Sequence, residues 1–168
     1  MMSETILNWL NQHQDYALLL IPAFAFLEAI PVVGLFISGA ILLTISTVLY
    51  TQQIASLSEV LPLAFIFAAL ADHLGFFVGR WVGPKLHHTT FARRHQKQIL
   101  RAEGIVLRFG PAAVILGRLI TMVRSLVPVF IGISGMRLLK FTLLDLVACL
   151  LWTTGLGLLI VGLDGVFS

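Results

Sequence analysis

The chain has 168 residues, and a mean hydropathy of +0.98 with only 11% charged residues excludes a water-soluble globular protein. Soluble domains carry about 25% charged residues, because their surfaces must be hydrated. The net charge of +3 is small and needs no acidic partner. We therefore interpret residues 1–168 as a single integral membrane domain and expect an all-α fold, in which each segment satisfies its own backbone hydrogen bonds.

The basic residues are distributed unevenly along the chain. No Lys or Arg occurs before Arg80, and seven of the eleven lie between Arg80 and Arg108. The positive-inside rule places residues 80–108 in the cytoplasm. A basic segment beside anionic lipid head groups does not indicate a nucleic-acid partner. Cys149 is the only cysteine, and no Cys/His spacing resembles a zinc site, so we predict no metal site and no cofactor.

The first predicted element is a short interfacial helix over residues 3–15, anchored by Trp9. An apolar run of 35 residues follows, over residues 16–50. One helix of that length would measure about 52 Å, whereas the hydrocarbon core is about 30 Å thick and two full spans need about 40 residues. We therefore predict a broken or re-entrant hairpin that turns near residues 28–34, beginning at Glu28.

Three further elements follow: a polar connection over residues 51–59, a membrane span over 60–82, and a basic, partly helical cytoplasmic segment over 83–104. The connection lacks Lys and Arg and is expected on the periplasmic side. The span holds an ionisable residue, Asp72, near its middle. It also holds three glycines at four-residue spacing, which is typical of close helix packing: Gly75, Gly79 and Gly83.

A second interrupted apolar run, over residues 104–136, contains Arg118 and Arg124. A guanidinium at bilayer depth costs about 3 kcal/mol or more, so such a residue faces a partner, a cavity or a substrate. The two arginines therefore indicate an anion that is handled inside a membrane. The last predicted span covers residues 143–161, and we expect Asp145, near its start, to reach the membrane interface.

A short internal repeat supports this division of the chain. Ile37–Leu43 and Ile133–Leu139 share five identities in seven positions, at an offset of 96 residues. Two repeats separated by one crossing have opposite orientations, and transporters of this design bind their substrate at the midplane between broken segments. We therefore predict two inverted repeats, residues 16–82 and 105–163, each a re-entrant or broken helical hairpin followed by a transmembrane helix.

The segment Gly117-Arg118-Leu-Ile-Thr-Met-Val-Arg124-Ser-Leu-Val-Pro128 resembles the G-R-F-x-P-x-x-R-x-x-x-P signature of the DedA family, bacterial relatives of the eukaryotic VTT-domain lipid scramblases. Asp72-His-Leu-Gly75-Phe-Phe-Val-Gly79-Arg80 is similar to the family's D-x-x-G-Y-x-x-G-R segment. The stretch from Glu28 to Gly39 resembles its first re-entrant segment. The resemblance covers roughly residues 20–160.

This resemblance implies a bacterial inner-membrane protein whose two re-entrant hairpins meet at the bilayer centre and which transports lipid phosphates. Undecaprenyl phosphate, the polyprenyl carrier returned across the membrane for envelope synthesis, is the substrate class it implies most directly; some members are associated with phospholipid movement. Three positions depart from the pattern. Thr121 replaces the usual proline between the arginines, Ala40 stands where many members have an acidic residue, and Asp145 stands where the family often has Asn.

Arg118 and Arg124 are the candidate phosphate-binding residues, because a guanidinium offers a planar fork of donors and stays protonated. They lie about 120° apart on a regular helix, so they converge only if the segment bends. Glu28 and Asp72 are the candidate counter-charges, and the repeat offset of 96 residues places Glu28 on Arg124. Our hypothesis is that the carboxylates hold the arginines until phosphate arrives, with proton or cation coupling. Purely structural salt bridges are the alternative.

The leading hypothesis is therefore a transporter or flippase whose partners are membrane lipids, a polyprenyl phosphate or a phospholipid; a homo-oligomer is left open. A general phospholipid scramblase is the nearest alternative. An intramembrane lipid-phosphate phosphatase is disfavoured, because no His/Asp nucleophile arrangement lies near the arginines and His73 has no clear catalytic partner in the sequence. An ion or proton transporter and a scaffold without substrate complete the alternatives.

Overall fold

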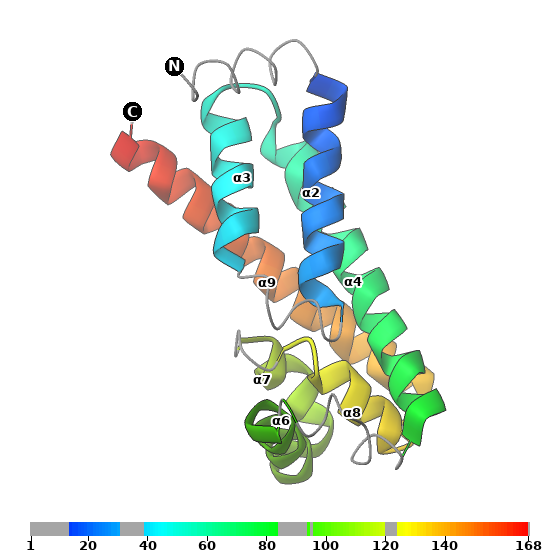
Figure 1. The fold of residues 1–168 in the computed structure, drawn as a ribbon. Coiled ribbons are helices and arrows are strands. Elements are labelled where there is room, and N and C mark those ends of the chain that lie inside the picture. Colours follow the sequence, from blue (N-terminus) through cyan, green and yellow to red (C-terminus); the bar gives the residue numbers. More distant parts are fainter. Residues whose placement is uncertain (1–13, 31–38, 84–93, 95, 120–123, 168) are drawn as a thin grey trace.

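The described residues of the computed structural model form helices and contain no β-strand, which confirms the all-α expectation for this part of the chain (Figure 1). The described residues are 14–30, 39–83, 94, 96–119 and 124–167. The predicted interfacial helix falls largely outside them. The elements are α2 (Gln14–Ala29), α3 (Gly39–Thr51), α4 (Leu57–Val82), α6 (Gln96–Phe109), the 3-10 helix η3 (Gly110–Ala112), α7 (Ala113–Leu119), α8 (Val127–Ile133) and α9 (Leu138–Phe167).

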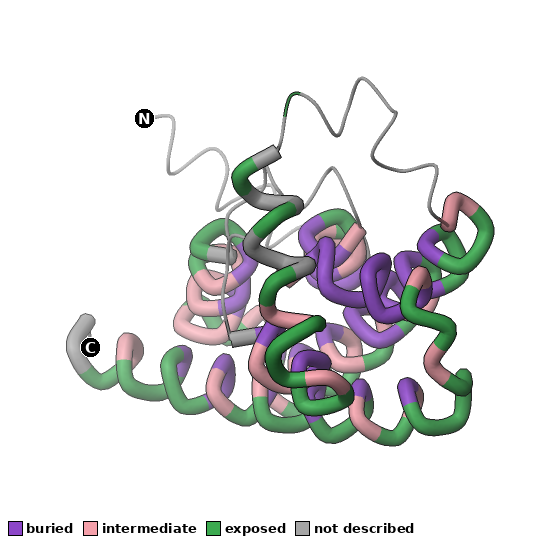
Figure 2. The backbone as a smooth tube through the Cα atoms, turned by 90° about the horizontal axis from the view of Figure 1, so that it is seen from below, coloured by how far each residue is buried: buried purple, intermediate pink, exposed green. Residues whose placement is uncertain are grey.

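Two helices are long and apolar enough to cross a membrane: α4, with 26 residues, and the Leu138–Gly165 part of α9, with 28. At 1.5 Å per residue they measure about 39 and 42 Å, more than a hydrocarbon core of about 30 Å. They run in opposite directions and cross (Figure 1). Exposed positions recur along the whole of α9 (Figure 2), and many of them are apolar, as at Leu150 and Leu158.

The first apolar run is divided into α2 and α3, which lie side by side and run in opposite directions (Figure 1). Because α2 ends at Ala29, the predicted interruption of this run is confirmed; residues 31–38 lie outside the described part. The two helices measure about 24 and 20 Å at 1.5 Å per residue, so each is shorter than the hydrocarbon core. Their apolar core with α4 and α9 includes Ile21, Leu42, Val60 and Ile160.

The second interrupted run folds into short helices at the opposite end of α4 and α9. α7 and α8 have seven residues each, and the residues between them, 120–123, lie outside the described part. Their core includes Phe76 of α4, Phe130 of α8 and Phe141 of α9, and the rings of Phe76 and Phe141 stack with centroids 4.5 Å apart. The molecule therefore has two apolar cores, one at each end.

A layer of buried polar side chains separates these two cores. Along α4, Ala64 belongs to the first core and Phe76 to the second, and buried Asp72 lies between them. Along α9, Phe141 and Leu156 belong to different cores in the same way. The polar layer therefore lies along the middle part of both long helices, the part that is deepest in the bilayer if these helices span it.

Close contact between α4 and α8 depends on two glycines. A Cβ atom at Gly79 would overlap the backbone of Val129, and one at Gly132 would overlap the carbonyl of Phe76. The packing role predicted for Gly79 is therefore confirmed. The same prediction is wrong for Gly83, where a Cβ would meet nothing within 4 Å. Gly83 instead ends α4 with φ of +52°, a conformation that glycine adopts without strain.

Gly79→Ala is expected to lower the free energy of unfolding by about 1–3 kcal/mol, the usual effect of overpacking, because the backbone of α8 must move away. Chemical unfolding in detergent or nanodiscs measures the change. The matched control is Gly155→Ala in α9, where the added Cβ would meet nothing within 4 Å; alanine there should be neutral or stabilising. Equal unfolding midpoints for the two variants would contradict the close α4–α8 contact.

Several predicted boundaries are wrong by a few residues. α4 begins at Leu57 rather than at residue 60. At this start, Glu59 accepts hydrogen bonds from the Ser56 backbone N–H at 2.8 Å and from the Ser56 hydroxyl at 2.6 Å. The helical part of the basic segment is α6, which continues to Phe109, so the predicted start of the second repeat at residue 105 falls inside a helix. α9 begins at Leu138, five residues before the predicted span.

Candidate functional site

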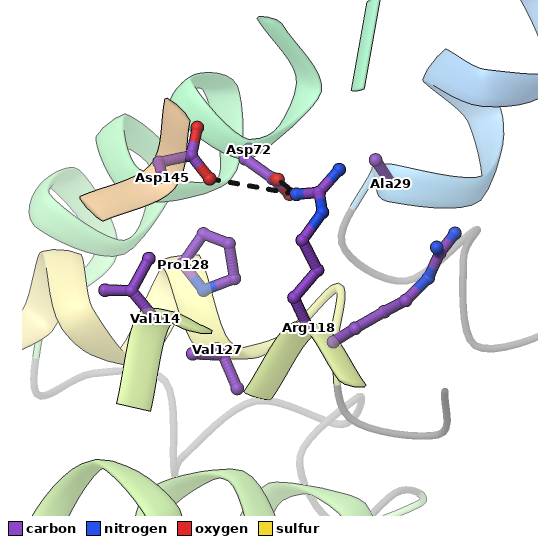
Figure 3. A pocket seen from close by; sticks show the side chains of 8 residues that line it. Ala29, Asp72, Val114, Arg118, Val127, Pro128 and Asp145 are labelled. Carbon is purple, nitrogen blue, oxygen red and sulfur yellow. Dashed lines mark hydrogen bonds and ion pairs between the residues drawn. The ribbon is translucent and has the colours of Figure 1, made fainter. Parts of the chain in front are cut away.

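The side chain of Arg118, at the end of α7, lies between two carboxylates from the two long helices (Figure 3). Its Nη1 donates to Oδ2 of Asp72 on α4. The same Nη1 lies 3.7 Å from Oδ1 of Asp145 on α9. All three residues are buried, with exposed fractions of 8%, 3% and 2% for Arg118, Asp72 and Asp145. This ion triad ties α7 to both long helices.

The second arginine pairs with the first hairpin. Nη2 of Arg124 contacts Oε1 of Glu28, in the last turn of α2. Glu28 is 1% exposed, so its carboxylate has almost no access to water. The ion pair therefore joins residues from the two interrupted apolar runs. The structure brings all four candidate residues into one buried layer.

Trp152 of α9 holds both guanidinium groups against one ring. The Cζ atoms of Arg118 and Arg124 lie 5.3 and 5.6 Å from the ring centroid. A cation over an aromatic face at this distance is attracted by the ring quadrupole, by up to about 2 kcal/mol where water is excluded. The two arginines therefore converge although they are six residues apart in the sequence. Sequence analysis assigned Trp152 no role. Its position in the middle of the span is a signal for one, because tryptophans of membrane helices concentrate at the interfaces.

Asp145 and His73 correct two sequence predictions. Asp145 does not reach the interface: α9 begins early enough to place it two turns inside the helix, on the buried side. His73 does have partners, since its Nδ1 lies 3.5 Å from Oδ2 of Asp145. With the proton on Nδ1, the ring donates to the Ala69 carbonyl at 2.8 Å and accepts from the Thr142 hydroxyl at 2.9 Å. His73 is half-buried and forms the outer edge of the polar layer.

The charges and hydrogen bonds of this layer are not fully matched. In the described part of the chain, two guanidinium groups face three carboxylates, Glu28, Asp72 and Asp145, so the carboxylates outnumber the cations by one. Among the described residues, Arg118 Nε, Glu28 Oε2 and Asp145 Oδ2 are buried without a hydrogen-bond partner. Unpaired buried polar atoms are rare in a purely structural network, and they favour a site that exchanges partners.

The layer encloses only a very small cavity. Its volume is about 10 Å³, at or below the minimum that holds one water molecule. A phosphate group therefore enters only if the carboxylates or the helices move, so the arrangement is closed. The cavity is lined by Ala29, Asp72, Val114, Arg118, Arg124, Val127, Pro128 and Asp145 (Figure 3).

A metal ion fits this cluster poorly. Ligand atoms of Asp72, Asp145 and Cys149 lie within 4.8 Å of one another. However, the Arg118 guanidinium already lies against both carboxylates, and its positive charge would repel a divalent cation. The Arg118 guanidinium therefore occupies the position between the two carboxylates that a metal ion would need.

The fold and site define a class of protein: a helical membrane protein with a buried layer of paired arginines and carboxylates between two interrupted apolar segments. The sequence profile of the VTT domain matches residues 30–161. The chain belongs to this family, the VTT-domain or DedA family of membrane proteins, as its motifs predict.

Similar proteins from other bacteria are named as membrane proteins. The chain is 25% identical over 151 residues to an uncharacterised membrane protein of Buchnera aphidicola and 24% identical over 159 residues to the inner membrane protein YabI of Escherichia coli; both alignments cover 90% of this chain and 59% of the relative. The inner membrane protein YghB of Salmonella typhimurium is 29% identical over 120 residues, 71% of this chain and 55% of that protein. The chain thus spans about three fifths of its relatives' length. No solved structure matches it significantly.

Trp152→Ala is expected to lower the free energy of unfolding by about 3–5 kcal/mol through the cavity it leaves, because both arginines lose their shared ring. Trp152→Phe keeps an aromatic face and should retain the fold with a smaller loss. Thermal unfolding measures both changes. Trp81→Ala, at a side chain that is 89% exposed, is the control; comparable losses in that variant would contradict a specific role for Trp152.

Proposed function

We propose that this chain is a bacterial inner-membrane transporter that moves a lipid phosphate, undecaprenyl phosphate, across the bilayer. In this proposal Arg118 and Arg124 bind the phosphate, and Glu28 and Asp72 balance their charge when no phosphate is bound. Segment 80–108 faces the cytoplasm, following the positive-inside rule. The chain carries its substrate and does not act as an enzyme.

The observation that supports the proposal is the burial of two arginines between two apolar cores. A lipid head group that crosses a bilayer needs a polar path at this depth, while its tail remains in the surrounding hydrocarbon. The Arg118 side chain is held by two carboxylates, and Arg124 by one. Ion pairs of this kind can be exchanged, because a phosphate presents the same oxygen geometry to the guanidinium fork as a carboxylate.

The number of guanidinium groups favours a phosphate monoester over a phospholipid. A monoester carries about −1.5 to −2 charges at pH 7, which two arginines neutralise together. The phosphodiester of a phospholipid carries one negative charge, so it would neutralise one guanidinium and leave the other on its carboxylate. The two arginines lie 5.3 and 5.6 Å from the same Trp152 ring and line the same small cavity. A polyprenyl phosphate therefore suits the site better than a diester head group.

Exchange of partners provides a transport cycle. The closed state has carboxylates on both arginines and a cavity of about 10 Å³. An arriving phosphate displaces Asp72 from Arg118 and Glu28 from Arg124, and protons neutralise the carboxylates that are released into an apolar environment. We infer that α2–α3 and α7–α8 are the two re-entrant hairpins of an inverted repeat. Their placement at opposite ends of α4 and α9 supports a rocking motion about the buried layer.

The proposal is tested in liposomes that contain undecaprenyl phosphate and the purified protein. A membrane-impermeant phosphatase, added outside, cleaves only lipid phosphate in the outer leaflet. With the transporter, the inner-leaflet pool becomes cleavable within minutes; protein-free liposomes retain it. Retention of that pool in the presence of folded protein would contradict the proposal.

Two further arms of the same assay separate the alternatives. Release of phosphate without added phosphatase would show a lipid-phosphate phosphatase instead. Equal movement of a fluorescent neutral or zwitterionic phospholipid would show a general scramblase, because the paired arginines would then give no selectivity. Both outcomes overturn the assignment to a polyprenyl phosphate.

A further inference from the structure

A second, larger hollow lies next to the closed site. Its volume is about 600 Å³, within the range of small-molecule binding sites. It uses the same helices as the buried layer: Pro111 lines the hollow one turn before Val114 of the small cavity, and Ile131 lines it one turn after Val127. The hollow is lined by Val106, Leu107, Gly110, Pro111, Ile131, Ser134, Gly135, Met136, Arg137 and Lys140.

The chemistry of the hollow suits an anionic amphiphile. Among the side chains that the structure describes, its lining contains two basic ones, Arg137 and Lys140, and no acidic one. Both basic side chains are exposed and free to bind an anion at the rim. The remaining lining is mostly apolar, and Leu107 exposes 80% of its surface beside it. Arg80 donates to the Met136 carbonyl at 3.5 Å, which fixes the backbone just before the two basic residues.

The sizes of the two cavities suggest an order of events. The buried layer has no room for a phosphate in the closed arrangement, whereas the hollow has about 600 Å³. A lipid phosphate can therefore bind at the hollow first, with its head between Arg137 and Lys140. The first carbons of its tail would lie on the apolar lining beside Leu107, toward the surrounding hydrocarbon.

We propose that this hollow is a separate binding site for the phosphate head of a prenyl or acyl monophosphate, which is exchanged between the hollow and Arg118. The transport step rests on the proposed function, but binding at the hollow does not require transport. Failure of binding and failure of transport are therefore distinguishable. Arg118→Lys, which keeps the positive charge between the two carboxylates, should slow transport and leave binding at the hollow unchanged.

The test uses the full chain in nanodiscs of zwitterionic lipid, with farnesyl monophosphate as the probe. Arg137→Ala combined with Lys140→Ala should weaken binding by about tenfold or more, since hydrogen bonds to charged groups contribute about 1.5–3 kcal/mol. The control variant, Arg94→Ala with Lys97→Ala, removes the same charge from exposed positions of the basic segment outside the hollow. Thermal unfolding should be unchanged in both variants, because all four side chains are exposed.

Two companion probes show which part of the ligand the hollow recognises. Farnesol, which lacks the phosphate, and inorganic phosphate, which lacks the tail, should each bind much more weakly than farnesyl monophosphate. Equally weakened binding of farnesyl monophosphate in the control variant would show a general attraction to basic charge. Unchanged binding in the Arg137/Lys140 variant would place the site elsewhere. Either result overturns the proposal. A photoreactive prenyl monophosphate gives a measurement on the unaltered chain, and it should label peptides containing Leu107 or Met136.

Discussion

Arg118→Ala is expected to abolish lipid-phosphate transport and to lower the free energy of unfolding by about 3–5 kcal/mol, as removal of one partner from a buried ion pair does. The variant leaves Asp72 and Asp145 buried without the guanidinium that lies between them. Arg118→Lys keeps the positive charge but loses the planar fork. It should remain folded and transport about tenfold more slowly or worse. Liposome flux and chemical unfolding measure the two effects.

A second variant separates a role in transport from a role in folding. Arg118→Ala combined with Asp72→Asn removes the guanidinium together with one of its two carboxylates, and it should recover much of the lost stability. Transport should remain absent, because no donor fork is left to bind phosphate beside Asp145. Near-normal transport in this folded double variant would show that Arg118 is only a structural partner.

Exchanging the charges of the second pair has the other large expected effect. Arg124→Glu or Glu28→Arg alone places two like charges at a contact that excludes water, and each should lower stability by about 3–5 kcal/mol. Arg124→Glu combined with Glu28→Arg restores one charge of each sign, so folding should return. Transport should not return, because the guanidinium then lies in α2 rather than beside Arg118 and Trp152.

The stability and the transport of the charge-exchange double variant each test a separate claim. Stability that stays low in the double variant would contradict a direct contact between Glu28 and Arg124. Full transport in the double variant would remove Arg124 from the phosphate-binding residues and leave it as a link between the two hairpins. Expression level, size-exclusion profile and unfolding midpoint are measured together with flux, so that loss of protein is not mistaken for loss of transport.

The sequence predicts those features that depend on composition and local pattern. Charge content and length predict an all-α membrane protein, and Glu28 marks the end of α2. The burial of Arg118 and Arg124 follows from the energetic penalty of a guanidinium in hydrocarbon. The internal repeat also relates Glu28 to Arg124, whose side chains are in contact.

The remaining partners depend on how distant helices meet, which local patterns do not encode. Asp145 lies near the start of the predicted span, yet five additional residues at the start of α9 move it inside the helix and against Arg118. In the sequence, Trp152 is one of several aromatic side chains in apolar runs. Only the packing of α9 against α7 brings its ring against Arg118. His73 acquires Thr142 as a partner only because α4 and α9 pack together.

The central claim is that Arg118 and Arg124 lie inside the bilayer and bind a lipid phosphate, and side-specific chemistry on the unaltered protein tests it most directly. A water-soluble dicarbonyl reagent that modifies arginine is added to protein in liposomes, and peptide mass spectrometry gives the modification rate of each arginine. We expect Arg118 and Arg124 to react far more slowly than exposed Arg94, and farnesyl monophosphate, but not farnesol, to slow them further. Reaction of both at the rate of Arg94, unchanged by farnesyl monophosphate, would contradict the account.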